Sequence, residues 1–292
     1  MLIQRCLAAG GSVDVVLLTD GDDNPWPQRW MEKRVFIGAE GRRRWGARRR
    51  LEVAAALGRL GVPADRLHAQ GWHDMQVTSQ LRHQHGPAVG ALRRVIERVR
   101  PTVLVIPDLG DRHPDHGAAH VLSRLALHAA GSTADVLTYM VHGTEASAPE
   151  DLLVPDQDEG RQATKIAAVL EHATQMALSR ERMLGIAARP ERYDRPPPAP
   201  VGDTLRLPWR PGPLARARLR VLLADGQGAR HWAWRSAPLE RDGEDWLLAL
   251  RPVPGPAFVK LTADLSTPWI FDRYGWVSQD PEPVGLVARP VG

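Results

Sequence analysis

The first two hundred residues alternate between two spacings of hydrophobic positions, one typical of strands and the other typical of helices. Short apolar, β-branched runs predict buried strands, and they lie at 13–19, 102–107 and 135–141. Segments with apolar residues on one helical face predict helices, and they lie at 48–60, 91–99, 117–129 and 163–184. Strands that alternate with helices indicate an α/β fold, in which a mostly parallel, Rossmann-like sheet has helices on both faces.

The pattern changes near a proline-rich stretch at residue 195. Beyond it, short apolar segments are separated by Gly, Pro and Asp turns, which is typical of antiparallel strands. These segments are 217–223, 231–235, 245–250 and 258–263. The sequence therefore predicts three parts: an α/β domain over 1–194, a stiff linker over 195–202, and a small all-β, sandwich-like domain over 203–292.

Six of the ten tryptophans lie in the predicted β domain, and they allow two interpretations. They are Trp209, Trp232, Trp234, Trp246, Trp269 and Trp276. We favour packing between two sheets, because large aromatic rings commonly fill such cores. The alternative is a carbohydrate-binding face, since sugars present apolar C–H groups to aromatic rings.

Composition narrows the class of protein. The single cysteine, Cys6, excludes an intramolecular disulfide and a zinc site built on several thiolates, and it fits a reducing, cytoplasmic location. No apolar run has the length of a membrane span, and the first residues do not read as a signal peptide.

The net charge of +4 comes mainly from arginine, and six arginines lie within residues 41–50. We expect a solvated loop and the first turn of a helix here. Such a cluster suits anionic partners, namely nucleic acid, lipid headgroups or a phosphorylated sugar. We expect no nucleic-acid partner, because no nucleic-acid-binding module accompanies the arginines. A peripheral contact with a membrane stays open.

The stretch from Asp108 to Gly117 carries the clearest chemistry. It follows a predicted strand and precedes a predicted helix, which places it where ligand sites form in α/β sheets. His113 and His116 lie three residues apart, with Asp115 between them. Imidazole is a common zinc ligand, a carboxylate can fix its tautomer, and a histidine that does not bind metal can donate to an oxyanion. The alternative is a pair of solvated loop histidines.

Other motifs in the same order extend this observation to a resemblance. His113-Pro-Asp-His116 is similar to the second signature of the PIG-L/LmbE-like deacetylases. The further matches are a T-D-G turn at 19–21, an R-x-x-E helix at 49–52, a G-x-x-D element at 71–74, a strand that ends in His142, and a K…H-x-[ST]-Q helix from Lys165 to Gln175. The resemblance covers roughly residues 1 to 195 and implies an LmbE-like fold for that part.

The resemblance implies a chemistry and a set of roles. The family binds a divalent metal, usually zinc, through a His and an Asp of an N-terminal H-P-D-D-E-type loop and through the residue that matches His116. His113 is expected to stabilise the tetrahedral oxyanion, with Asp115 as its orienting partner. Substrate contacts are expected at Asp20, Arg49, Asp74 and His172. The implied reaction removes the acetyl group from an N-acetylated amino sugar, in a small molecule, a glycolipid or a cell-envelope glycan.

The sequence departs from the family in one respect, because no H-P-D-D-E-type motif occurs before His113. We interpret the aspartates at 20–23 as turn-forming residues and not as replacements. Two explanations stay open: a reading frame that starts at an internal Met, and a degenerate paralogue. We favour the first, because a decayed enzyme has little reason to keep the second signature together with His172. With His116 as the one ligand, zinc binding is expected to be weak or absent, and the alternative function is an inactive, glycan-binding paralogue.

The remaining histidines are expected to have no role in a site. His73 lies beside Asp74 in a predicted surface loop. His83, His85 and His120 lack a partner at metal-binding spacing and are expected to be solvated. No serine-hydrolase, P-loop or dinucleotide-binding motif occurs.

Overall fold

The computed structural model describes residues 1–143, 152–154, 158–197, 199–250, 254–263 and 271–279. The chain divides into two compact units. Unit 1 comprises Met1–Val77 and Ala146–Asp194, and unit 2 comprises Thr78–Glu145 and Arg195–Gly292. No helix in the described part of the chain has the length and apolar character needed to cross a bilayer.

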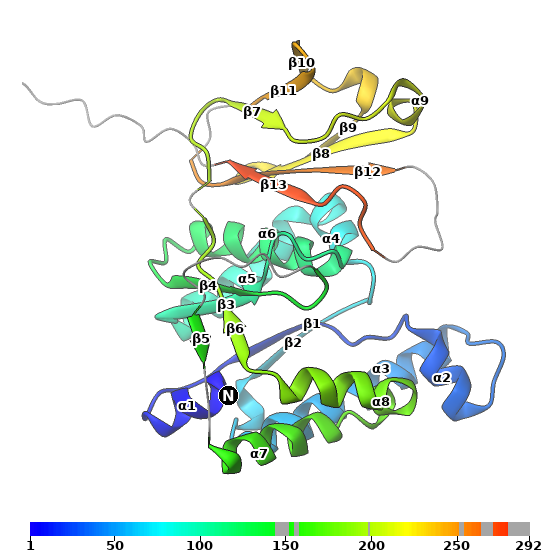
Figure 1. Cartoon of the computed structure of the whole chain (residues 1–292), viewed down its shortest axis with the longest axis vertical. Coiled ribbons are helices and arrows are strands. Elements are labelled where there is room, and N and C mark those ends of the chain that lie inside the picture. The colour runs from blue at the N-terminus through cyan, green and yellow to red at the C-terminus, as the bar shows by residue number, and fades with distance from the viewer. Residues whose placement is uncertain (144–151, 155–157, 198, 251–253, 264–270, 280–292) are drawn as a thin grey trace, which may run out of the picture. The chain divides into compact units, whose positions relative to one another are not determined.

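Unit 1 combines helices with two small pairs of strands (Figure 1). Its first half contains α1 (Leu2–Ala8), β1 (Val15–Thr19), α2 (Pro25–Glu32), α3 (Ala39–Arg59), η1 (Ala64–Arg66) and β2 (Leu67–Trp72). Its second half contains β5 (Leu152–Val154), α7 (Glu159–Leu170), α8 (Ala173–Ala188) and β6 (Glu191–Tyr193). β1 and β2 are parallel, and β5 and β6 are antiparallel. α3 packs against α7, and α2 packs against α8.

Unit 2 begins with α/β elements and continues with antiparallel strands. The α/β elements are α4 (Val77–His83), α5 (His85–Val99), β3 (Val103–Pro107), α6 (Pro114–Ala129) and β4 (Asp135–Tyr139). The later elements are β7 (Thr204–Leu207), α9 (Pro213–Arg216), β8 (Leu219–Asp225), β9 (Gly228–Ala233), η2 (Trp234–Ser236), β10 (Leu239–Asp242), β11 (Asp245–Ala249), β12 (Ala257–Ala263) and β13 (Trp276–Gln279). β3 and β4 are parallel and in register, and α6 packs on both β3 and α5.

The antiparallel strands form two sheets that share one core, as the sequence pattern predicts. One sheet has the strand order β13-β12-β8-β9, and the other has the order β10-β11-β7. Alternate side chains along a strand point to the same face, so Val221 and Leu223 of β8 point into the space that Leu205 and Leu207 of β7 also fill. Burial from both sheets in one apolar cluster is the defining feature of a β-sandwich. The α/β region followed by antiparallel strands confirms the predicted fold class.

The tryptophans of this region pack as the favoured interpretation expects. Trp234 lies in the shared core, and Trp209, Trp232 and Trp246 pack against it. Trp234 and Trp246 meet edge to face at a centroid distance of 5.3 Å, a favourable arrangement for aromatic pairs. Trp269 lies outside the described residues.

Two helix predictions need correction. The arginine run at 41–50 is not a loop, because α3 begins at Ala39 and includes it. The single helix predicted over 163–184 is two helices, α7 and α8, with a break at Glu171 and His172. A distant side chain stabilises this break: the Glu52 carboxylate accepts hydrogen bonds from the Thr174 N–H (3.1 Å) and hydroxyl (2.5 Å) at the start of α8. A carboxylate there satisfies an otherwise unpaired N–H and favours the positive end of the helix dipole.

Candidate functional site

The loop between β3 and α6 contains a buried carboxylate at its centre. Asp111 is 1% exposed. It accepts hydrogen bonds from the N–H groups of His113 (2.9 Å), Val141 (2.9 Å) and His142 (3.1 Å), so it joins this loop to the segment that follows β4. It also contacts His116 Nδ1 at 2.9 Å. The loop conformation is therefore built around one acid.

Asp111 is ionised near neutral pH and well into the acidic range. Burial raises its pKa, but the hydrogen bonds from His116 and from the backbone N–H groups outweigh burial and lower the pKa to about 2. An ionised carboxylate only accepts hydrogen bonds. His116 Nδ1 must consequently carry a proton and donate it to Asp111.

This hydrogen bond fixes the tautomer of His116. A neutral imidazole carries its proton on one nitrogen alone, so Nε2 of His116 has a free lone pair whenever the ring is neutral. The side chain is 28% exposed, which leaves the ring partly open. A carboxylate that holds one nitrogen while the other presents a lone pair is the usual support of a metal-binding or proton-accepting histidine.

In His113 the donor and acceptor nitrogens are exchanged relative to His116. His113 occupies the N-cap position of α6, and its Nδ1 accepts the Asp115 N–H at 3.3 Å. Burial first, and the neighbouring His116 and His142 next, lower its pKa to about 4, so the ring is neutral near pH 7. Its single proton therefore lies on Nε2, which is a hydrogen-bond donor.

A third imidazole completes the cluster. The His142 ring lies 5.7 Å from the His113 ring and 5.4 Å from the His116 ring, between centroids, and the latter two rings are 4.6 Å apart. His142 is the third residue after β4 (Asp135–Tyr139), beyond the carboxyl end of a strand parallel to β3. The topology of two parallel strands thus brings their trailing loops to one edge.

Residues that follow β12 line this cluster. The Phe271 ring lies 5.5 Å from the His142 ring and has the Arg112 guanidinium 5.4 Å above it. The Asp272 N–H donates to the Arg112 carbonyl oxygen at 2.8 Å. The antiparallel part of unit 2 therefore contributes to the surroundings of the histidines.

Asp115 is buried beside a lysine that comes from β12. Asp115 is 6% exposed, and its backbone N–H donates to His113 Nδ1. Lys260 is 2% exposed and pairs with Asp272. Burial lowers the pKa of Lys260, and the charges of Asp272 and Asp115 oppose that shift. Trp276 lies under the Lys260 ammonium, 5.3 Å from it.

A second polar cluster lies in unit 1, around the end of β1. Asp22 is 7% exposed and accepts hydrogen bonds from His73 Nδ1 (2.6 Å) and the Asp74 N–H (2.9 Å). Arg49 donates to the Gly21 carbonyl oxygen at 2.6 Å. Asp22 is thus more than a turn-forming residue, because it joins the loop after β1 to the loop after β2.

Arg49 and Asp74 form the charged centre of this second cluster. Burial lowers the pKa of Arg49, and the nearby carboxylate of Asp74 is the largest influence that opposes it. Burial raises the pKa of Asp74, and Arg49 in turn lowers it. His172 directly precedes α8. Burial lowers the pKa of His172, the charge of Glu52 opposes this shift, and the charge of Arg49 adds to it. Arg49 is thus within electrostatic reach of both Asp74 and His172.

Asp20, the fourth predicted residue, acts on Arg49 through its charge but is paired with another arginine. Its carboxylate forms an ion pair with Arg50, whose Nε lies 3.0 Å from Oδ1. The ion pair occupies both carboxylate oxygens. A substrate contact at Asp20 would have to compete with this pairing.

The residues present do not form a complete site for a divalent metal. A catalytic zinc takes three protein ligands. Within the described ranges, no group of three or more His, Cys, Asp or Glu side chains is arranged to hold a metal ion. Asp111 already binds Nδ1 of His116, so Nε2 of that ring is the single ligand atom that we assign.

Two histidines differ from the sequence expectation of solvated side chains. His120 is 2% exposed, its Nδ1 donates to the Pro107 carbonyl oxygen at 2.9 Å, and its ring meets Phe258 edge to face. His85 is half-buried, and burial lowers its pKa. Both face the later strands of unit 2, which the local sequence around each histidine does not reveal.

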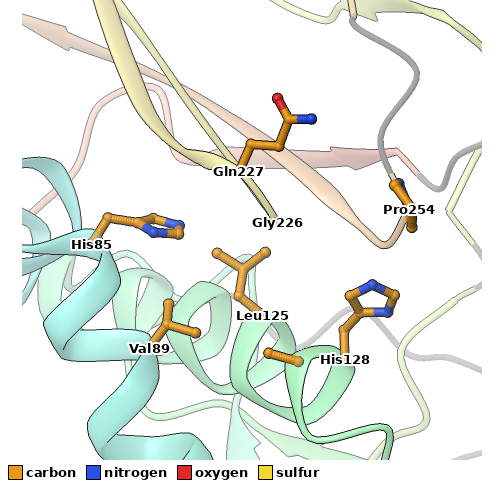
Figure 2. Close-up of a pocket in the computed structure, with 8 residues that line it drawn as sticks. His85, Val89, Leu125, His128, Gly226, Gln227 and Pro254 are labelled. Atoms are coloured by element: carbon orange, nitrogen blue, oxygen red, sulfur yellow. The ribbon is translucent and has the colours of Figure 1, made fainter.

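His85 lines a cavity of about 280 Å³ in unit 2 that contains none of the predicted site residues (Figure 2). The walls include Val89, Leu125 and His128 from the helices, and Gln227 and Pro254 from the later chain. The lining is mostly apolar, and we assign it no part in the chemistry.

Sequence reasoning missed several residues around the histidine cluster. Asp111 had a local signal, since it precedes His113 by two residues in the same polar loop. Phe271, Asp272 and Lys260 had none, because they lie more than a hundred residues away and reach the loop through the fold of unit 2.

Comparisons with known proteins identify the family of the first part of the chain. Residues 1–127 match the family model PIG-L, described as GlcNAc-PI de-N-acetylase. This range contains the predicted T-D-G, R-x-x-E, G-x-x-D and H-P-D-H motifs. No curated protein matches the sequence.

Several solved structures are similar to the chain over about two thirds of its length. A deacetylase triple mutant of the teicoplanin biosynthetic pathway is 19% identical, covers 67% of this chain and 91% of its own, and has a TM-score of 0.48. The conserved protein TT1542 from Thermus thermophilus is 24% identical, with coverages of 72% and 91% and a TM-score of 0.48. The N,N'-diacetylchitobiose deacetylase from Pyrococcus horikoshii is 16% identical, with coverages of 67% and 77% and a TM-score of 0.48. The family assignment rests on the sequence match: residues 1–127 of this chain are a PIG-L domain.

Proposed function

We propose that this chain acts on N-acetylated amino sugars and removes the acetyl group by hydrolysis of the amide. One observation carries the proposal: His113 and His116 present opposite polarities at Nε2, a proton on one ring and a lone pair on the other. Amide hydrolysis needs both a donor for the developing oxyanion and a basic or metal-binding nitrogen beside it.

His113 is the donor in this proposal. As the acetamide carbonyl becomes tetrahedral, negative charge develops on its oxygen, and the Nε2–H of a neutral, preoriented imidazole stabilises that charge without reorganisation. The Asp115 N–H holds the ring, and burial keeps it neutral. Loss of one such donor typically lowers kcat by about 10²–10³-fold.

His116 is the lone-pair residue, oriented by Asp111. In the PIG-L family the matching histidine is a ligand of the catalytic metal, which when bound activates water for attack on the amide. The described residues supply this one ligand and do not fit a complete zinc site. The role that we assign to His116 is to present Nε2.

Arg49, Asp74 and His172 are proposed to bind the substrate. Together they offer a buried guanidinium, a carboxylate and an imidazole, which suits hydroxyl groups and an anionic substituent such as a phosphate. A glycolipid or cell-envelope glycan is the substrate class that we favour. The single cysteine supports a cytoplasmic location.

The second candidate function is glycan binding without catalysis. It is favoured by one observation, the absence of a three-ligand metal group within the part of the chain that the structure describes. In that case the chain would bind an amino sugar and leave its amide intact.

Acetate release by the purified chain separates the two functions. The substrates would be N-acetylglucosamine and its phosphatidylinositol conjugate, each with and without added zinc. Under the proposal, acetate release is expected, and His113→Ala lowers kcat about a hundredfold or more with little change in KM. The control His83→Ala, at an exposed histidine, should retain activity. Glycan binding without release at any zinc concentration would replace hydrolysis by the second function.

A further inference from the structure

Unit 1 presents an unusual run of exposed aromatic and aliphatic side chains in and after α2. Trp26 and Trp30 are 67% and 68% exposed, and Val35 and Phe36 are 73% and 90% exposed. Trp45, in the next helix, is 1% exposed. Large apolar groups are rarely left in water in such a group unless they contact a partner.

The structure of α2 explains why these rings face outward. Trp26 and Trp30 are four residues apart and share one helical face. The opposite face is held by Gln28, which is 0% exposed and donates through Nε2 to the Gly41 carbonyl oxygen (2.8 Å) and to Glu32 (3.2 Å). Lys33 ends the helix in the left-handed conformation with φ of 50°. Because Gln28 holds its face of α2 against the protein, Trp26 and Trp30 on the opposite face point toward solvent.

The sequence segment that contains these apolar residues is rich in positive charge. Residues 26–50 contain nine Lys and Arg against two Glu, whereas the whole chain has 38 basic and 34 acidic residues. The rest of the chain consequently carries more acids than bases. Within the described ranges, the side chains of Lys33, Arg34 and Arg43 make no ion pair, so their charge is available to a partner.

We propose that the surface formed by Trp26, Trp30, Val35 and Phe36, together with Lys33, Arg34 and Arg43, binds the interfacial region of an anionic lipid bilayer. Tryptophan and phenylalanine enter the boundary between headgroups and acyl chains, while lysine and arginine attract anionic headgroups. Neither contribution alone gives stable anchoring, and this surface supplies both. The inference goes beyond the proposed hydrolysis and does not depend on it.

The lipid surface fits these observations better than the alternatives. Single-stranded nucleic acid stacks on aromatic rings beside cations, but it has no use for the exposed aliphatic Val35. A second copy of this basic surface would bring like charges together. Both alternatives become outcomes of the test.

The test is co-sedimentation of the full chain with lipid vesicles. One set contains phosphatidylcholine alone, and the other contains phosphatidylcholine mixed with phosphatidylglycerol. Binding to the anionic set, weakened by salt, is expected. Changing Trp26, Trp30 and Phe36 together to Ser should lower partitioning by at least about tenfold. Changing Lys33, Arg34 and Arg43 together to Gln should lower it about a hundredfold.

Matched controls separate this surface from general stickiness. Leu214→Ser removes an apolar side chain that is 91% exposed in unit 2. Arg94, Arg218 and Arg235 are exposed cations in unit 2, and changing them together to Gln alters the net charge by the same amount. Both controls should bind vesicles as the unchanged chain does, and all variants should keep its circular dichroism spectrum.

Three results would overturn the proposal. The first is absence of binding to the anionic vesicles. The second is equal binding by the two test variants and the unchanged chain. The third is that the chain does not bind vesicles but instead binds polyuridylate, or instead self-associates in a way that the change of Trp26, Trp30 and Phe36 to Ser abolishes.

Discussion

At the scale of the residue, the chemistry of this chain follows from where single protons lie. Asp111 is ionised, so it holds the proton of His116 on Nδ1, while the Asp115 N–H leaves the proton of His113 on Nε2. Two histidines of one tetrapeptide thereby acquire different roles. The sequence predicts the pair and, through family resemblance, the roles. It does not predict the acid that distinguishes them, because that depends on a loop bent around Asp111.

His120 should make the stability of the fold sensitive to acid. Burial lowers its pKa to about 4, against about 6.5 in an unfolded chain. As pH falls below about 6.5, the unfolded chain takes up this proton and the folded chain does not, so the free energy of unfolding decreases until about pH 4. Between pH 7.5 and pH 5, the protonation of this histidine in the unfolded chain should lower the free energy of unfolding by about 2 kcal/mol.

The measurement is urea unfolding at both pH values for the unchanged chain and for His120→Asn. The asparagine amide can still donate to the Pro107 carbonyl oxygen but does not titrate. Its free energy of unfolding should therefore fall by about 2 kcal/mol less over this range. Equal pH dependence in the two proteins would contradict the assignment.

At the scale of the element, the ends of helices depend on distant partners. The sequence predicts the strands at 13–19 and 102–107 well, because their apolar runs and flanking turns are local signals. It misses the break before α8, because the cap at Thr174 comes from Glu52, 122 residues away in sequence. Hydrophobic spacing within a segment cannot predict a helix cap that a side chain of another helix supplies.

Glu52→Gln should weaken the start of α8. A neutral amide loses the charge that favours the helix dipole and presents one acceptor where the Thr174 N–H and hydroxyl now share two. The expected loss is about 1–3 kcal/mol in the free energy of unfolding, measured by urea denaturation. Glu97→Gln, which removes an exposed ion pair with Arg93 on α5, is the control and should cost less than about 0.5 kcal/mol. Equal losses in the two variants would show that Glu52 is no special cap.

The pair Lys260 and Asp272 should behave as a buried unit. Asp272→Asn leaves the Lys260 ammonium buried without its ionised partner, at an expected cost of about 3 kcal/mol or more. Lys260→Met combined with Asp272→Asn removes the charge and should recover most of that loss. Thermal and urea unfolding of the single and double variants would measure the coupling. A double variant as unstable as the single one would mean that the ion pair does not account for the loss.

At the scale of the whole molecule, the sequence predicts the order and the type of the helices and strands. The α/β pattern, the antiparallel end of the chain and the tryptophan-rich core are all local consequences of hydrophobic spacing. The predicted division at 195–202 rests on composition alone. The compact units divide differently, since the segment Thr78–Glu145 groups with the later strands. Within unit 2, the His120 ring meets the Phe258 ring, and hydrophobic spacing along the sequence does not predict a contact between residues so far apart in the chain.

Charge is also arranged at this scale. The basic excess lies largely in residues 26–50, beside the exposed rings of α2, and the remaining chain is slightly acidic. Sequence analysis locates the arginine run but does not predict the exposed rings beside it. The exposure of Trp26 and Trp30 depends on which face of α2 Gln28 buries.

The most direct test of the account is the tautomer of each histidine in the H-P-D-H loop. Two-bond ¹H–¹⁵N correlation spectra of the metal-free protein near pH 7 report which ring nitrogen carries the proton, with assignments from His113→Asn and His116→Asn. We predict a protonated Nδ1 and a bare Nε2 for His116, and the reverse for His113. The same tautomer in both rings, or a doubly protonated His113, would contradict the division of roles on which the proposed function rests.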